Sequence, residues 1–285
     1  MLKNSFYFLC LCISIFFLSC AKDTISGDIN FENNPLKNRV LFHSFSNIFH
    51  QIELYARDTI LYEGYNDILI RIKDKDENYI SYAEIEWKAY SSDSIYSPFS
   101  KIIRSIDNPD VYTSFLIFPT NTSDKNWALE ISYQIQSSTY FATTFLTPQR
   151  PDSNQINIQS QIGLENKEYI VALVDPYFPI RGNNNCSILV YEKISSSEYI
   201  NLNNLNIIAW NSSENYTQDR TFEIDFRPIT EMYQGKIEIP DSGLWQLNLT
   251  IKDNKDNVIL GNEKSAKHPE SSLHFPLLTT NLLQN

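Results

Sequence analysis

The feature that most constrains the fold of this chain is an internal repeat with a spacing of about 120 residues. Residues 232–240 have the pattern of residues 111–119, with a tyrosine in second place and a proline at the end. A Trp-x-Leu-x-apolar segment follows each copy, beginning at Trp127 and at Trp245. Three further pairs keep the same order: Ile52 with Val171, Ile68 with Ile188, and Trp87 with Trp210. These matches predict two copies of one domain, each about the size of a seven-stranded sandwich.

The apolar residues follow the period of β-strands rather than that of helices. Ile68, Ile70 and Ile72 alternate with polar neighbours, which is typical of a strand with one buried face. No stretch keeps a helical period for more than a turn or two. We therefore predict an all-β chain of two tandem β-sandwich domains.

Breaks in this pattern predict the domain boundaries. The first sandwich is expected over residues 39–147 and the second over residues 161–278. Residues 148–160 contain two prolines among polar residues, which predicts a semi-rigid linker. Residues 279–285 are expected to form a polar tail.

The amino-terminal segment predicts where the protein is located. One basic residue, Lys3, precedes an apolar run over residues 6–18, which is too short to span a bilayer and is flanked like a secretory signal. The run ends in Leu-Ser-Cys, which resembles the lipobox of bacterial lipoproteins. This resemblance implies cleavage of residues 1–19, acylation of Cys20, and a flexible lipidated tether over residues 20–38. An ordinary signal peptide that ends near a cysteine is the alternative.

The residues after the predicted cleavage site indicate the target membrane. Ala21 follows the cysteine where an acidic residue would signal retention, so the sorting pattern indicates the outer membrane. Lys22 and Asp23 resemble the short charged signals that export Bacteroidota lipoproteins to the cell surface. Several acyl chains would form a durable membrane anchor. The periplasmic and the surface-exposed faces of the membrane both remain open.

Charge and cysteine content exclude several classes of partner and bond. A formal net charge of −11 disfavours binding to nucleic acid and to anionic lipid surfaces. Of the four cysteines, Cys10 and Cys12 leave with the signal and Cys20 takes the lipid. Cys186 remains alone, so no intramolecular disulfide is predicted, and we expect it to be a small buried residue.

Several segments together resemble tandem FixH-like (YtkA-like) domains of outer-membrane lipoproteins from Flavobacteria and relatives. The resemblance extends over residues 49–276 and is carried by residues 53–55, 64–74, 85–87, 233–239 and 243–247. It implies that both sandwiches are immunoglobulin-like and that the relatives handle copper or other metals through loops rich in Met and His.

The corresponding loops of this chain depart from that pattern. Residues 88–99 and 211–217 contain no Met, His or Cys, the ligands that would select copper. Copper is therefore implied by the resemblance only, and we predict no cofactor and no metal site. His43 and His50 could pair on a metal but lack a third ligand nearby, which favours a solvated pair. Residues 74–78 and 253–257 imitate calcium loops but lack the glycine and the closing glutamate, which favours hairpin turns.

Two sets of side chains are candidates for modification or contact. Asp-Ser/Thr-apolar triplets resemble the O-glycosylation sites of Bacteroidota and would place glycans on Thr24, Thr59 and Ser94. Aromatic residues gather after the predicted strands that end in tryptophan, either to contact a partner or to cap the sandwich ends. They are Tyr90, Tyr96, Phe99, Trp210 and Tyr216.

No combination of residues indicates a catalytic centre, and we predict no enzyme. The sequence favours a non-catalytic lipoprotein that serves an envelope transport or metal (copper)-handling assembly. Its partner would be an outer-membrane barrel such as a TonB-dependent receptor. The alternative is a structural or adhesive surface lipoprotein that binds protein or glycan.

Overall fold

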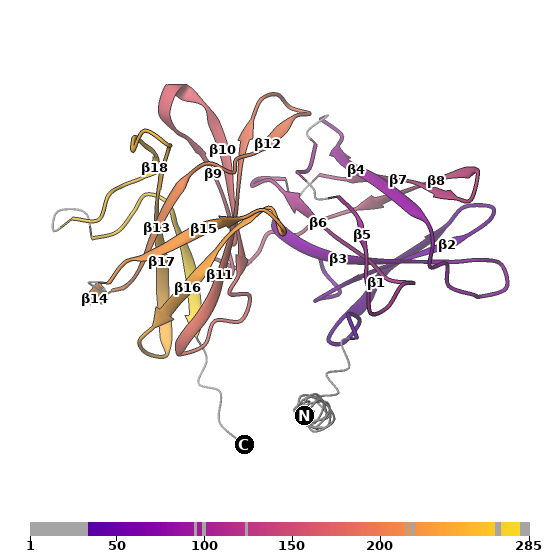
Figure 1. Ribbon diagram of the computed structural model, residues 1–285, viewed down its shortest axis with the longest axis horizontal. Coiled ribbons are helices and arrows are strands. Elements are labelled where there is room, and N and C mark those ends of the chain that lie inside the picture. Colours follow the sequence, from indigo (N-terminus) through magenta and orange to yellow (C-terminus); the bar gives the residue numbers. More distant parts are fainter. Residues whose placement is uncertain are drawn as a thin grey trace, which may run out of the picture. The chain divides into compact units, whose positions relative to one another are not determined.

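The computed structural model of the chain describes most of residues 34–279 (Figure 1). The residues not described are 1–33, 94–95, 99–100, 123–124, 215, 218–219, 266–268 and 280–285. The described residues belong to one compact unit. None of their helices is long and apolar enough to cross a membrane. The predicted signal peptide and the lipidation site at Cys20 lie outside the described residues.

The amino-terminal half folds as a sandwich of two antiparallel sheets. The five-stranded sheet has the order β1-β2-β3-β6-β5, with bounds Val40–Ser46, Gln51–Ala56, Gly64–Lys73, Tyr112–Phe118 and Ile103–Arg104. The three-stranded sheet has the order β4-β7-β8, with bounds Glu84–Ser91, Trp127–Ile135 and Ser138–Leu146. This division of strands is that of an immunoglobulin-like domain, with one additional edge strand.

Alternation along the strands builds the core between these two sheets. Ile68, Ile70 and Ile72 of β3 are fully buried, as their spacing predicts. From the facing sheet, Trp87 and Leu129 complete the same hydrophobic cluster. Burial of these side chains supplies the main driving force for folding, since the described residues contain no disulfide.

The carboxy-terminal half repeats this arrangement with additional strands. One layer contains β9, β10, β11, β12 and β16, with bounds Ile158–Ile162, Glu168–Asp175, Gly182–Lys193, Tyr199–Asn201 and Met232–Ile239. The other contains β13, β14, β17, β18 and β19, with bounds Asn206–Ser213, Tyr216–Thr217, Gly243–Lys252, Val258–Gly261 and His274–Thr279. Strand β15 (Phe222–Arg227) pairs with β13 at its start and with β16 at its end, and so joins the two layers. A single 3-10 turn, Leu164–Asn166, lies between β9 and β10. The all-β fold of two tandem immunoglobulin-like sandwiches is confirmed.

Tyr112 and Tyr233, the second residues of the two repeat segments, have the same structural role. Both rings are buried, and each hydroxyl accepts a hydrogen bond from the backbone N–H just before the first strand of the facing sheet. The donors are Ala83 N at 2.8 Å and Leu205 N at 2.9 Å. The repeated tyrosine therefore connects the two layers of each sandwich.

The register of two predicted pairs differs from the structure. Gly64 lies opposite Phe118 and Gly182 lies opposite Ile239, so Ile68 corresponds to Cys186 rather than to Ile188. The match of Trp87 with Trp210 fails for a related reason. Trp87 is opposite Ile131 and faces the core, whereas Trp210 is opposite Asn248, on the other face of its sheet.

A third hydrophobic cluster joins the two halves through the outer faces of their larger sheets. Phe115 and Ile117 of β6 pack in this cluster with Ile170 of β10, Leu189 of β11 and other buried side chains. The predicted linker is part of this interface, because its residue Ile158 is buried and begins β9. The two sandwiches are therefore held by packed apolar side chains as well as by the linker.

Candidate functional site

The predicted contact aromatics do not form one cluster. Tyr90 and Tyr96 stack with their ring centroids 5.3 Å apart, and the Tyr90 hydroxyl donates to Glu130 Oε1 at 2.5 Å. Tyr216 belongs to the second sandwich, where its exposed ring contacts Trp245 edge-on. Phe99 lies outside the described residues.

Trp210 is not available to a partner, contrary to the prediction. Its side chain is fully buried, and its indole N–H donates to the carbonyl oxygen of Pro269 at 2.8 Å. The physical reason is the register of β13, which turns this ring away from the core and under the segment that precedes β19. Trp210 therefore holds the segment before β19 against the outer face of the sheet that contains β13.

Among the predicted glycosylation sites, only Thr59 can be placed. It is exposed in the connection between β2 and β3, and its backbone N–H and its hydroxyl donate to Asp58 Oδ1 at 2.6 and 3.2 Å. Thr24 and Ser94 lie outside the described residues. The position of Thr59 is compatible with access by a modifying enzyme.

The two amino-terminal histidines are engaged separately rather than forming a solvated pair. His43 Nε2 lies 2.6 Å from Thr144 Oγ1, and His50 Nδ1 lies 3.0 Å from the Tyr133 hydroxyl. Burial lowers the pKa of both imidazoles. Within the described ranges, no three His, Cys, Asp or Glu side chains are grouped as a metal site would require.

Both acidic loops are hairpin turns, as the sequence predicts. Asp74 Oδ1 accepts hydrogen bonds from the backbone N–H groups of Asp76 and Asn78, at 2.8 and 2.9 Å. Asp253 Oδ1 does the same two and four residues further along its own loop. The two turns occupy different hairpins, however, because Asp74 follows β3 and Asp253 follows β17.

Cys186 is confirmed as a buried interior residue. It lies on β11 in the core of the second sandwich with no exposed surface. Burial raises the pKa of its thiol far above the ordinary value. A thiol in this environment is inert as a nucleophile.

The outer face of β4-β7-β8 carries exposed aromatic residues that the sequence analysis did not single out. Phe141 and Phe145 of β8 are 71% and 67% exposed. Phe145 lies opposite Ala128 of β7, which in turn lies opposite Tyr90 of β4. Their spacing along β8 could have revealed them, since it places both rings on the face away from Ala142 and the core. We call Tyr90, Tyr96, Phe141 and Phe145 the aromatic face.

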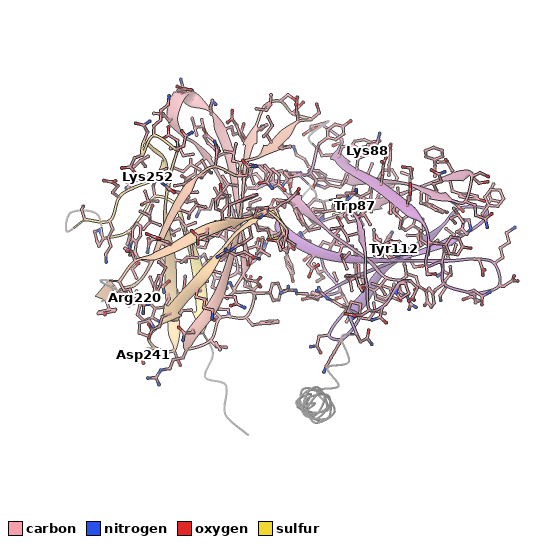
Figure 2. The ribbon with its side chains drawn as sticks, viewed as in Figure 1. Trp87, Lys88, Tyr112, Arg220, Asp241 and Lys252 are labelled. Atoms are coloured by element: carbon pink, nitrogen blue, oxygen red, sulfur yellow. The ribbon has the colours of Figure 1, made fainter. Side chains whose placement is uncertain are left out.

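An ion pair lies in the adjacent row of the same sheet. Lys88 Nζ is 2.7 Å from Glu130 Oε2, and Glu130 also accepts the hydrogen bond from Tyr90. These two bonds, from Lys88 first and then Tyr90, lower the pKa of Glu130. Figure 2 locates Lys88 next to Trp87 on β4; Lys88 is largely exposed, whereas Trp87 is buried in the core. The strand thus separates a polar and aromatic outer surface from the apolar interior.

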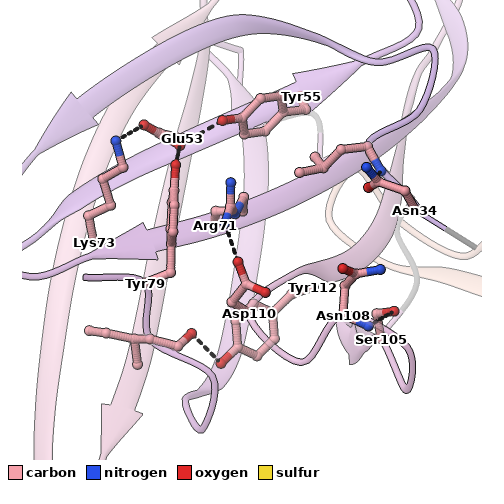
Figure 3. A network of polar contacts seen from close by, with 12 residues as sticks. Asn34, Glu53, Tyr55, Arg71, Lys73, Tyr79, Ser105, Asn108, Asp110 and Tyr112 are labelled. Atoms are coloured by element: carbon pink, nitrogen blue, oxygen red, sulfur yellow. Dashed lines mark hydrogen bonds and ion pairs between the residues drawn. The ribbon is translucent and has the colours of Figure 1, made fainter. Parts of the chain in front are cut away.

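A second polar cluster covers the outer face of β2 and β3 (Figure 3). The carboxylate of Glu53, a residue only 4% exposed, accepts hydrogen bonds from Lys73 Nζ at 2.9 Å, Tyr55 OH at 2.7 Å and Tyr79 OH at 3.2 Å. Burial alone would raise the pKa of Glu53, but these bonds outweigh it and lower the pKa. Arg71 lies over the Tyr79 ring at 3.1 Å and pairs with the carboxylate of Asp110. The groups bond to one another, which is the arrangement of a structural network.

A groove of about 420 Å³ lies where the two sandwiches meet. Its walls come from the connection between β2 and β3, the linker, the loop between β10 and β11, and β19. The Arg57 guanidinium lies 4.4 Å from the centroid of the Tyr177 ring and 3.4 Å from Asp67 Oδ2. Its volume is in the range of about 300 to 1,000 Å³ that small-ligand sites occupy.

Comparison with known proteins reveals only remote structural likeness. No known protein family and no curated protein matches the sequence. The solved structures that resemble the fold include the Escherichia coli adhesin FdeC, with 11% identity and a TM-score of 0.24. The match covers 84% of this chain and 66% of the adhesin chain. A conserved domain protein from Bacillus anthracis matches with 7% identity and a TM-score of 0.34, over 83% of this chain and 86% of its own. An endo-fucoidan hydrolase of glycoside hydrolase family 107 matches with 8% identity and a TM-score of 0.21, over 84% of this chain and 38% of its own.

Proposed function

We propose that this protein is a non-catalytic binding subunit, anchored to the outer membrane through Cys20, that docks onto a membrane partner by its aromatic face. The observation that carries the proposal is the exposure of Phe141 and Phe145 on the sheet face that also holds Tyr90. Aromatic side chains dominate the energetic centres of protein interfaces. The row of Lys88, Glu130 and Thr143 lies between the rows of Phe141 and Phe145, so this surface combines aromatic and charged groups.

Charge around the aromatic face indicates the chemistry of the partner. Glu84 and Glu86 are exposed on the same face of β4, and Glu86 lies in one row with Ser132 and Phe141. A matching surface would offer apolar contacts to the two rings on β8 and basic residues to the edge strand β4. An outer-membrane barrel such as a TonB-dependent receptor would fit the predicted anchor, because the tether holds the two proteins in the same membrane.

The environment of the acid and base groups supports binding rather than catalysis. Glu53 is held by three hydrogen bonds from its neighbours, and the two amino-terminal histidines each bond to a hydroxyl. Groups committed in this way are poorly suited to exchange protons with a substrate. A copper role would need ligands that the loops at residues 88–99 and 211–217 do not supply.

The experiment that tests this function is a detergent pull-down of the lipidated protein from native membranes. The wild type is compared with a variant that carries both Phe141→Ser and Phe145→Ser, and Phe178→Ser serves as the control. Phe178 is similarly exposed but lies on the second sandwich. We expect wild type and control to recover one outer-membrane barrel in stoichiometric amount, and the double variant to lose it. Recovery of the lipoprotein alone in all cases, or equal recovery by the double variant, would refute the proposal.

A further inference from the structure

We propose that the groove between the two sandwiches is a binding site for a neutral oligosaccharide. The site is separate from the aromatic face, because its walls are formed by other segments. The residues that carry the argument are Arg57, Tyr62, Asn154, Gln155, Tyr177 and Phe178.

An aromatic platform forms one wall of the groove. Tyr177 and Phe178 meet edge to face, with centroids 4.6 Å apart and planes at 90°. They are 38% and 79% exposed, although large aromatic side chains usually gain stability by burial. Prolines precede and follow the pair and limit the freedom of the loop. Arg57 lies over the Tyr177 ring and fixes it from the first sandwich. The platform is therefore built in advance of any ligand.

Some polar side chains of the groove are already used by the protein. The Asn66 amide bonds to backbone groups of Tyr62 and Gly64, and the Asn157 amide bonds to the backbone of Tyr65. Asp67 receives the guanidinium groups of Arg39 and Arg57. These residues hold the walls in place and do not offer free groups to a ligand.

Other polar side chains that line the groove have no hydrogen-bond partner within the described ranges. They are the amides of Asn154 and Gln155 and the hydroxyls of Tyr62 and Tyr177. An amide both donates and accepts through separate atoms, and a phenol can do either. The groove thus offers donors and acceptors side by side next to an exposed ring.

The charges of the groove favour a neutral ligand. Three carboxylates and one guanidinium line the groove, and each is already bonded within the protein. Asp67 pairs with Arg57 and with Arg39 behind it, Asp58 accepts from Thr59, and Glu63 is buried and accepts from Thr122 N. An anionic ligand would meet more carboxylates than guanidinium groups, and a cationic ligand would lose its hydration while competing with the bonds that these carboxylates already make.

The mixture of groups distinguishes a sugar from a proline-rich peptide. A sugar ring has apolar C–H faces that stack on an aromatic ring, and its hydroxyls both donate and accept. A proline-rich segment also packs in aromatic grooves, but it offers carbonyl acceptors and few N–H donors. It would leave the amide oxygens of Asn154 and Gln155 without donors. The observed groups therefore complement a neutral oligosaccharide better.

The test uses the full-length protein in a detergent without a sugar headgroup. Isothermal titration calorimetry is carried out with hexasaccharides of glucose, mannose, xylose and N-acetylglucosamine, and with a sulfated oligosaccharide, a polyproline peptide and anionic lipid vesicles. We expect at least one neutral hexasaccharide to bind. Phe178→Ala should weaken it by about tenfold or more, and Asn154→Ala should also weaken it. Tyr82→Ala, at an exposed aromatic residue outside both the groove and the aromatic face, is the matched control and should leave the affinity unchanged.

Several outcomes would overturn the inference. They are failure of every neutral hexasaccharide to bind, binding only of the sulfated sugar, the peptide or the vesicles, and sugar binding that both groove variants leave unchanged. Phe178 and Asn154 lie in a loop and in the linker, and thermal unfolding of each variant checks that it folds as the wild type does. The pull-down of the membrane partner is independent of this result, so either proposal can fail without the other.

Discussion

Asn66 and Asn184 occupy the same position in the two sandwiches and make the same three hydrogen bonds. The Asn66 amide donates to the carbonyl oxygens of Tyr62 and Gly64, at 2.7 and 2.9 Å, and accepts from Tyr62 N at 3.0 Å. The Asn184 amide donates to Ile180 O and Gly182 O at the same distances and accepts from Ile180 N at 2.9 Å. Asn66 closes the loop that leads into β3, and Asn184 closes the loop that leads into β11.

Replacement of either asparagine by alanine should destabilise the protein. Loss of the side chain leaves partly buried backbone groups without their partner, which costs up to about 1 to 3 kcal/mol. Asn184→Ala should be the more costly, because Asn184 is buried whereas Asn66 is partly exposed. Urea unfolding measures the difference, and Asn183→Ala, at an exposed neighbouring position, is the control. A loss no larger than that of the control would contradict this role.

Gly64 and Gly182 differ in the space around them although both require a positive φ. Their φ angles are 106° and 93°. A Cβ on Gly64 would lie 1.7 Å from Asn157 Oδ1, whereas a Cβ on Gly182 would have no atom within 4 Å. Gly182→Ala should therefore cost only the backbone strain of about 1 to 3 kcal/mol. Gly64→Ala should cost more, because Asn157 must leave its place between the two sandwiches.

The comparison of the two glycine variants measures how firmly the linker is held. Both proteins are unfolded in urea under the same conditions, and the difference between them isolates the contribution of Asn157. In the background of Asn157→Ala, the two glycine substitutions should become similar in cost. If Gly64→Ala and Gly182→Ala lowered the free energy of unfolding equally while Asn157 is present, the Asn157 side chain would be shown to move aside freely.

Cys186 should be unreactive in the folded protein. With the signal removed and Cys20 acylated, it would be the one free thiol of the mature chain. Its side chain has no exposed surface, and burial raises the pKa of the thiol. We expect no alkylation by iodoacetamide over hours in native buffer and complete alkylation in urea, as measured by mass spectrometry. Rapid labelling of the folded protein would indicate that the core of the second sandwich opens.

Alternation of residue types was sufficient to predict the strands and the fold class, because many strands, such as β4 and β7, bury one face only. The repeated tyrosine was also visible, since Tyr112 and Tyr233 keep both their neighbours and their role. Register was harder to predict, because the spacing between copies changes along the chain. Gly64 aligns with Gly182, yet Phe118 aligns with Ile239, as loops of different length separate the strands.

The interface and the groove could not be predicted from local patterns. Phe115 and Ile117 flank Leu116 in the sequence, and all three look like core residues. Leu116 packs in the core of its own sandwich, whereas Phe115 and Ile117 lie on the other face of β6 and pack against the other sandwich. The groove combines segments as distant as Arg57 and Leu278, which only the packing of the two sandwiches brings together. Phe178 lies in a loop, where no strand alternation applies, so its exposure is recognisable only after burial is known.

Glu53 makes a pH-dependent contribution to stability that can be measured directly. Its folded-state pKa is lowered, because hydrogen bonds from Lys73, Tyr55 and Tyr79 outweigh the effect of burial. A lowered pKa gives stability that is present above the unfolded-state value of about 4.3 and lost as pH falls through the folded-state value.

Glu53→Gln keeps the shape but removes the charge, and should cost about 1 to 3 kcal/mol near pH 7. Urea unfolding from pH 7 downward should show the two proteins converging in acid. Thr113→Val, at a residue of β6 that hydrogen-bonds outside the network, serves as a control with no such pH dependence. A difference between wild type and Glu53→Gln that stays constant with pH would show that the Glu53 charge does not stabilise the fold.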